Sequence, residues 1–334
     1  MRRLKSLLLC IFLTLVVVPT AAQQPLPRFE PVDTCPFDVP GGQSPRCGYL
    51  VVPEDRSDPA NTQTIRLAVA IFPARSAAPA TDPLIYLDGG PGGATLSSVR
   101  FLWGSLYAPF AEDRDLILFD QRGTGLSEPA LTCSELTEFT YQFLDDVLPV
   151  ADYVARYQEA FTTCADRLRS EGVNLAAYNS AASAADVNDL RQTLGYQQAN
   201  LMGISYGTRL ALTILRDFPA TIRSAIIDAV LPLQASGFDP ALTADRAFNE
   251  LFAACQSSPR CDSRYPNLRE VFNAVVEQLN ANPAQLTVAS PRGMQSALMD
   301  GDTFVGLLFI GLYADTLIPQ MPSTIYAASQ GDYS

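Results

Sequence analysis

Short apolar runs alternate with helical patterns over the first two thirds of the chain. Between the later runs, Ala185–Leu194 and Thr208–Phe218 place apolar residues on one face at helical spacing. Alternating strands and helices predict an α/β fold, in which a mostly parallel sheet carries helices on both faces. The runs whose length and β-branched content suit buried strands are Gly48–Val52, Ile65–Phe72, Leu84–Leu87, Leu116–Phe119, Asn200–Met202 and Ser224–Ile227.

The pattern changes after Pro232. The sequence then shows helical periodicity and a single weak strand candidate, Gln285–Val288. We therefore expect a core over residues 23–232 and an inserted helical cap over residues 233–334, with the chain ending within or just after the cap. The helical patterns of this region are Ala247–Cys255, Leu268–Leu279 and Thr303–Tyr313.

The N-terminus has the pattern of an export signal. A basic start (Arg2, Arg3, Lys5) precedes the apolar run Leu7–Val18, and small residues follow at positions 20–22. The run is about 12 residues long, too short to span a bilayer comfortably, although an N-terminal anchor is the alternative. We expect residues 1–22 to be a signal peptide and the mature protein to be periplasmic or extracellular. We expect no stable membrane insertion once the signal is removed.

Six cysteines remain after this segment. An even number in an exported chain favours disulfides, and proximity along the sequence favours Cys35–Cys47 and Cys255–Cys261, which leaves Cys133–Cys164. Free buried thiols are the alternative, because six cysteines allow 15 pairings.

Composition excludes several classes of function. The 334 residues are 48% apolar and 17% charged, so a large buried core is available. A formal net charge of −12 argues against nucleic acid as a partner. The chain has no histidine, which removes the usual general base and the commonest metal ligand. We expect no metal and no cofactor.

The sharpest chemical signal is Gly203-Ile204-Ser205-Tyr206-Gly207, which matches G-x-S-x-G. In this motif a serine occupies a strained turn between a strand and a helix, and the glycines remove clashes with neighbouring backbone. A strand pattern precedes the motif and a helix pattern follows it. Ser205 is therefore the candidate nucleophile, and a serine in an ordinary tight turn is the alternative.

A second glycine-rich segment, Asp88-Gly89-Gly90-Pro91-Gly92-Gly93, follows the third predicted strand. Small residues there let backbone N–H groups approach a substrate oxygen. We expect the amides of Gly90 and Tyr206 to form an oxyanion hole, and we assign no role to Asp88. A phosphate-binding loop is a weak alternative because neither G-x-G-x-x-G nor Gly-Lys-Ser/Thr is present.

Two further acidic positions follow predicted strands. The segment Asp120-Gln121-Arg122-Gly123-Thr124-Gly125-Leu126-Ser127 contains an Asp and an Arg beside a glycine turn, which favours a structural role through paired hydrogen bonds. Asp228 ends the sixth predicted strand and could orient a base, but capping of the next turn explains it equally well.

Together these segments carry a family resemblance. Gly-Gly-Pro-Gly-Gly, then Asp-Gln-Arg-Gly-Thr-Gly-x-Ser, then Gly-Ile-Ser-Tyr-Gly-Thr resemble the α/β-hydrolase serine peptidases of the prolyl iminopeptidase and tripeptidyl aminopeptidase group. Cys47–Asp55 resembles the first strand of its exported members, and Ala185–Tyr196 resembles the helix before the nucleophile. The similarity covers about residues 35–334.

The resemblance implies an aminopeptidase that cleaves short peptides through an acyl-enzyme on Ser205, with Gly90 and Tyr206 as oxyanion donors. A cap that selects the peptide N-terminus calls for an acidic group, for which Glu250 and Asp245 are weak candidates. The family's catalytic Asp and His follow the cap, after the last two core strands. We therefore expect a C-terminally truncated hydrolase that lacks those strands and is nearly inactive as given. The alternatives are an esterase on the same fold and a non-catalytic exported binding protein.

Overall fold

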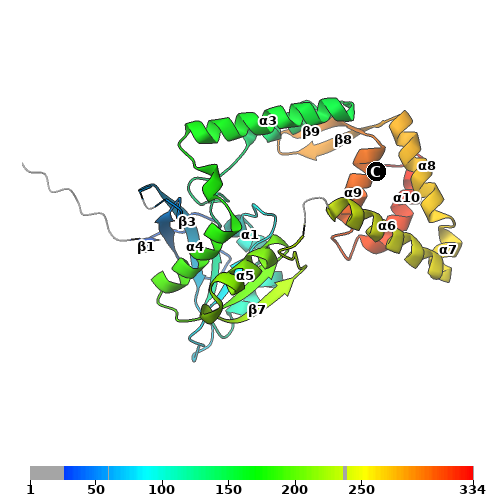
Figure 1. Cartoon of the computed structure of the whole chain (residues 1–334). Coiled ribbons are helices and arrows are strands. Elements are labelled where there is room, and N and C mark those ends of the chain that lie inside the picture. The colour runs from blue at the N-terminus through cyan, green and yellow to red at the C-terminus, as the bar shows by residue number, and fades with distance from the viewer. Residues whose placement is uncertain (1–25, 59, 236–238, 334) are drawn as a thin grey trace, which may run out of the picture.

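A seven-stranded sheet lies within about the first two thirds of the chain in the computed structural model, which describes residues 26–58, 60–235 and 239–333 (Figure 1). The spatial order of its strands is β1-β2-β3-β5-β4-β6-β7. β1, β2, β3 and β5 pair antiparallel in turn, whereas β5, β4, β6 and β7 pair in parallel, so five strands share one direction and β1 and β3 oppose them. The strands are β1 (Arg28–Val32), β2 (Arg46–Pro53), β3 (Thr64–Phe72), β4 (Leu84–Leu87), β5 (Leu116–Phe119), β6 (Ala199–Ile204) and β7 (Ile222–Asp228).

Helices cover both faces of this sheet because alternate strand residues point to opposite sides. On β3, Ile65 and Leu67 join the buried cluster that packs on α4 (Ser180–Thr193) and α5 (Tyr206–Asp217). Ala68 and Phe72 join the cluster on the other face, with α1 (Thr95–Leu102). The structure thus has the expected α/β architecture with a mostly parallel sheet and helices on both faces.

Each of the six apolar runs forms a strand, with bounds that differ by a few residues at most. β1 is not among the strands that the sequence predicts, because Arg28–Val32 is short and contains a proline. It pairs antiparallel with β2 from Arg28 opposite Val51 to Val32 opposite Cys47. Pro31 is tolerated there because β1 lies at the edge of the sheet, where one side of the strand needs no ladder hydrogen bond.

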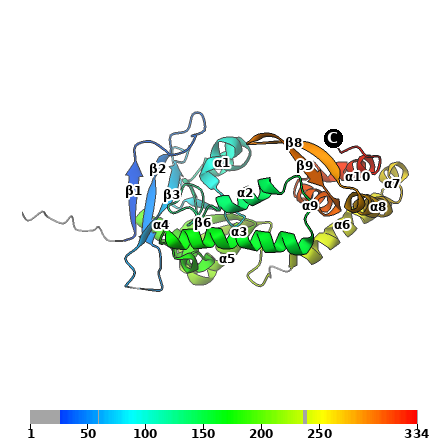
Figure 2. The same cartoon turned by 90° about the horizontal axis from the view of Figure 1, so that it is seen from above.

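Two helices outside the sheet, α2 (Ser134–Gln142) and α3 (Val150–Ser170), were also not expected. α3 extends between the sheet and a second group of elements (Figures 1 and 2). Tyr153 and Phe161 lie on its exposed apolar stripe, whereas Cys164 and Leu168 are buried. The helical spacing of these residues is present in the sequence and could have revealed the helix.

Residues from 239 onward form helices and a separate two-stranded sheet. Phe248, Phe272, Phe304 and Ile325 meet in their own buried cluster. The strand candidate Gln285–Val288 lies within β8, which pairs antiparallel with a second strand that was not expected. The elements are α6 (Asp239–Ser257), α7 (Pro259–Arg264), α8 (Leu268–Ala281), β8 (Ala284–Ser290), β9 (Gly293–Met299), α9 (Gly301–Gly311) and α10 (Met321–Ser329). The division of the chain into a core to residue 232 and a cap from 233 stays a prediction.

Three disulfides join the expected cysteine pairs: Cys35–Cys47 and Cys255–Cys261, which proximity favoured, and the remaining pair Cys133–Cys164. The proposed signal peptide, residues 1–22, lies outside the described residues. Within the described ranges, no helix combines the length and the apolar character needed to cross a bilayer.

Candidate active site

Ser205 occupies a sharp turn between β6 and α5. Its backbone has φ 54° and ψ −120°, a conformation that residues other than glycine rarely adopt. The side chain is exposed, and no described residue accepts a hydrogen bond from its hydroxyl. The strained turn therefore presents a free hydroxyl at the carboxyl end of the parallel strands, as a nucleophile elbow does.

The two glycines of the motif are required by close backbone contact. A Cβ on Gly203 would lie 2.4 Å from the carbonyl oxygen of Gly207. A Cβ on Gly207 would lie 1.9 Å from the carbonyl oxygen of Leu87, at the end of β4. Real Cβ atoms do not approach backbone this closely, so the start of α5 can pack against β6 only with glycine at 203 and against β4 only with glycine at 207.

The glycine loop of residues 88–93 lies directly beside the nucleophile. A Cβ on Gly89 would lie 3.0 Å from the Ser205 Cβ. Asp88 Oδ1 accepts the Gly89 N–H at 2.8 Å, and Asp88 Oδ2 accepts the Thr95 hydroxyl at 3.2 Å. Asp88, which has no role assigned from the sequence, therefore holds the start of this loop in place.

The expected oxyanion donors sit on the two segments that meet at Ser205. The Gly90 N–H makes no hydrogen bond to a described residue, and Gly90 has φ 110°. Tyr206 is the first residue of α5, where an N–H group has no partner within its helix. The Tyr206 hydroxyl lies 2.8 Å from the Ser180 hydroxyl of α4, which anchors the side chain. The assignment of these two amides as oxyanion donors stays a prediction.

The segment of residues 120–127 holds the site together. The buried Asp120 carboxylate accepts the N–H groups of Leu96, at 3.0 Å, and Leu126, at 2.8 Å. Burial raises the pKa of Asp120, against the effect of these hydrogen bonds. A Cβ on Gly125 would lie 2.2 Å from Asp120 Oδ2, so the glycine makes room for the carboxylate.

Arg122 from the same segment connects the sheet to α4. Its buried guanidinium donates to both carboxylate oxygens of Asp186, at 2.7 and 2.8 Å. It also donates to the carbonyl oxygens of Glu54 and Ala177. These contacts account for the structural role that the sequence favoured for the segment.

The two acidic candidates for an ammonium site, Asp245 and Glu250, both lie on α6 and are exposed. Asp245 lines a groove of about 490 Å³ together with Phe248 and Glu277, whereas Glu250 is not among its lining residues. In both views α6 lies apart from the β6–α5 turn (Figures 1 and 2). The structure thus brings neither carboxylate to Ser205.

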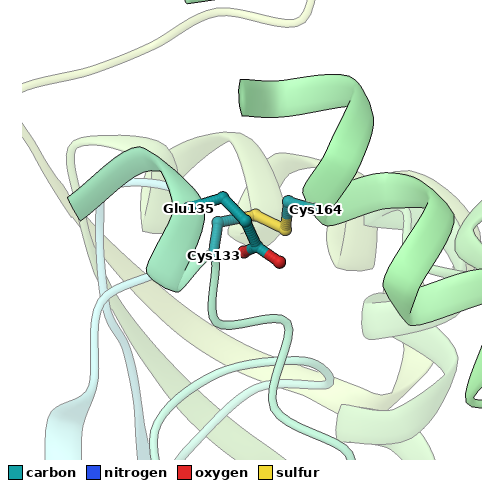
Figure 3. A group of neighbouring side chains, drawn as sticks. All are labelled: Cys133, Glu135 and Cys164. Carbon is teal, nitrogen blue, oxygen red and sulfur yellow. A yellow bond between two sulfur atoms is a disulfide. The ribbon is translucent and has the colours of Figure 1, made fainter. Parts of the chain in front are cut away.

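One cluster of potential metal ligands occurs among the described residues, formed by Cys133, Glu135 and Cys164 (Figure 3). The two sulfur atoms are bonded to each other, and Glu135 pairs with Arg167 at 2.7 Å. The hydrogen bond from Arg167 lowers the pKa of Glu135 to about 2. The cluster therefore links the start of α2 to α3. Its sulfur atoms are in a disulfide and its carboxylate is in an ion pair, so they are not available to a metal ion.

No imidazole exists anywhere in the 334 residues. Asp228, the other acidic residue considered from the sequence, ends β7 directly beside the nucleophile. Its carbonyl oxygen accepts the Ser205 N–H at 2.9 Å, so its backbone contributes to the turn. The carboxylate belongs to an exposed residue.

Comparison with known sequences agrees with this geometry. Residues 82–253, just over half of the chain, match the sequence profile of the alpha/beta hydrolase fold. The chain belongs to the α/β hydrolase fold family. The matched α/β hydrolase region includes the glycine loop, the elbow and most of α6.

Curated relatives carry peptidase and esterase names. Serine protease Hip1 of Mycobacterium tuberculosis is 27% identical over 299 residues, which cover 84% of this chain and 54% of that protein. Tripeptidyl aminopeptidase of Streptomyces coelicolor is 32% identical, over 56% of this chain and 35% of that protein. Carboxylesterase B of Mycobacterium tuberculosis is 30% identical, over 75% of this chain and 49% of that protein. This α/β hydrolase spans about half the length of the first curated relatives it matches.

Proposed function

We propose that this chain carries the nucleophile and the oxyanion hole of an exported serine aminopeptidase that acts on short peptides. The observation that supports this most strongly is the strained Ser205 turn, packed against the glycine loop of residues 88–93. In the mechanism, Ser205 Oγ attacks the scissile carbonyl carbon and its proton passes to a base. The Gly90 and Tyr206 amides then stabilise the negative oxygen until the base returns the proton to the leaving amine. Water then hydrolyses the acyl-enzyme and frees Ser205.

The base is the missing component within this sequence. Without a histidine, no imidazole of this chain can accept the Ser205 proton. Oxyanion stabilisation and substrate binding alone give about 10³–10⁴-fold acceleration over water, far below a complete triad. We propose that the 334-residue chain by itself is nearly inactive.

Export is part of the same proposal. Three disulfides are typical of proteins from oxidising compartments, and the first 22 residues have the pattern of a signal peptide. The proposed location is periplasmic or extracellular.

The test is labelling with a fluorophosphonate probe, with and without added imidazole. We expect slow labelling of the purified chain, faster labelling when imidazole supplies the base, and none for Ser205→Ala under either condition. Equal labelling of the parent chain and Ser205→Ala would refute the nucleophile. Fast labelling and ordinary peptidase turnover without imidazole would show that another residue is the base.

An esterase on the same fold is the second candidate, favoured by the similarity to carboxylesterase B. Turnover of an alanine anilide and of a simple acyl ester, both with imidazole present, distinguishes the two. The absence of histidine also fits a non-catalytic binding protein, which predicts no labelling under any condition.

A further inference from the structure

A pocket of about 410 Å³ opens beside the nucleophile turn, and the proposed mechanism does not use it. Gly92 from the glycine loop and Tyr206 from the elbow form one part of its lining. Gln121 and Thr124 line it from the segment after β5, and Ser183 lines it from α4. Its size is within the range of small-molecule sites, and it borders both segments that would hold the oxyanion.

The pocket presents no free charge. Arg122 is the ionised residue of its lining; Asp186 neutralises its charge, and its guanidinium makes four hydrogen bonds to Asp186 and two carbonyl oxygens. An ammonium or a carboxylate entering the pocket would therefore lose water without gaining an opposite charge, which is costly. The pocket suits neutral polar groups.

Gln121 supplies the matching hydrogen-bonding capacity. The residue is 6% exposed, and its Nε2 donates to the carbonyl oxygen of Asp88 at 3.1 Å. A carboxamide has two N–H donors and an acceptor oxygen, so one donor and the Oε1 acceptor remain without a partner among the described residues. Ser183, also 6% exposed, lines the same pocket. The Gln121 carboxamide and the Ser183 hydroxyl are not among the fully buried, unpaired polar atoms of the described residues, so a ligand in the pocket can replace water at them.

We propose that this pocket binds main-chain amides of the peptide substrate, and that the Gln121 carboxamide pairs with the main chain of one substrate residue. In an extended peptide the N–H and C=O of one residue point to the same side, so the N–H can donate to Oε1 and the C=O can accept from Nε2. The inference rests on the proposed function, because it assigns a peptide as the substrate. Since Gln121 also holds the Asp88 carbonyl, the same side chain connects substrate binding to the loop that carries the Gly90 amide.

The test is equilibrium binding, which needs neither Ser205 nor a base. The full chain carrying Ser205→Ala is titrated by calorimetry with trialanine amide and with two depsipeptides, each with an ester oxygen in place of one backbone N–H. We expect one depsipeptide to bind about fivefold more weakly than the amide, the effect of one lost hydrogen bond. Adding Gln121→Met, which keeps the side-chain length and removes its polar atoms, should abolish this difference.

Gln192→Met is the matched control, because Gln192 is exposed on α4 and is not among the residues that line the pocket. This variant should leave the difference in affinity between trialanine amide and the weaker depsipeptide unchanged. Equal affinities for all three ligands, no binding of trialanine amide, or discrimination that persists in Gln121→Met would each overturn the proposal. If Gln121→Met does not fold, the affinities of the three ligands for the chain with Ser205→Ala alone test the proposal. Fluorophosphonate labelling of Ser205 is independent of these results, so the nucleophile can stand when the pocket proposal fails.

Discussion

The backbone N–H of Ser205 donates a hydrogen bond to the carbonyl oxygen of Asp228 at 2.9 Å. This bond joins the ends of β6 and β7, at the point where the backbone turns after each strand. The next residue after Asp228 is Ala229, which has φ 54°, the same value as Ser205. Two residues other than glycine with positive φ therefore directly follow the adjacent strands β6 and β7, and one hydrogen bond connects their segments.

Ala229→Gly is expected to stabilise the fold. Its Cβ disfavours the left-handed conformation by about 1–2 kcal/mol, which exceeds the extra entropy that glycine loses on folding. We expect a net gain of about 0.5–1 kcal/mol in the free energy of unfolding, measured by urea denaturation. Ala254→Gly, within α6, is the control and should cost about 1 kcal/mol. A loss of stability in Ala229→Gly similar to that of the control would contradict the strain argument.

Gly207→Ala is expected to destabilise the protein by about 2–3 kcal/mol, because the added Cβ would overlap the carbonyl oxygen of Leu87. Gly306→Ala, on α9, adds a methyl group with no heavy atom within 4 Å, and should stabilise the helix by about 1 kcal/mol. Chemical denaturation of both variants measures these changes in the free energy of unfolding. Equal effects at the two positions would show that the elbow does not require glycine for space.

Asp186→Asn is expected to cost about 3–5 kcal/mol in stability. It removes the charge that neutralises the buried guanidinium of Arg122, whose side chain is 1% exposed. Asp166→Asn removes the partner of the exposed Arg169 and should change stability by less than about 0.5 kcal/mol. Thermal and urea denaturation of the two variants test this difference, and a similar small cost for both would refute the structural importance of the pair.

Glu135→Gln is expected to change how stability depends on pH. The pKa of Glu135 is about 2 in the folded protein and near 4.5 as a free group, chiefly because Arg167 donates a hydrogen bond to it. Its contribution is therefore fully present above about pH 4.5 and is lost as the pH falls towards 2. The melting temperature of the parent chain should exceed that of Glu135→Gln at pH 6, and the difference should disappear near pH 2.

Glu159→Gln, on an exposed turn of α3, is the control for this experiment. Its melting curve should follow that of the parent chain throughout the pH range. A constant difference between the parent and Glu135→Gln down to pH 2 would show that the carboxylate does not act through its charge.

The sequence by itself determined the strands of the sheet interior and the nucleophile turn. Runs such as Leu84–Leu87 and Leu116–Phe119 are apolar at every position, and only burial on both faces explains such runs. The G-x-S-x-G motif was equally visible, because contact with backbone excludes every side chain at Gly203 and Gly207. These features are local: each follows from the residues within a few positions.

Tertiary structure alone decided the partners that hold the site. Arg122 and Asp186 are 64 positions apart, and Gln121 and Asp88 are 33 apart, so no local pattern connects them. β1 and β9 form because a neighbouring strand satisfies their backbone groups, although neither has a strong strand pattern of its own. The sequence could identify Ser205, but the arrangement of polar groups around it depends on long-range packing that brings separate loops to one end of the sheet.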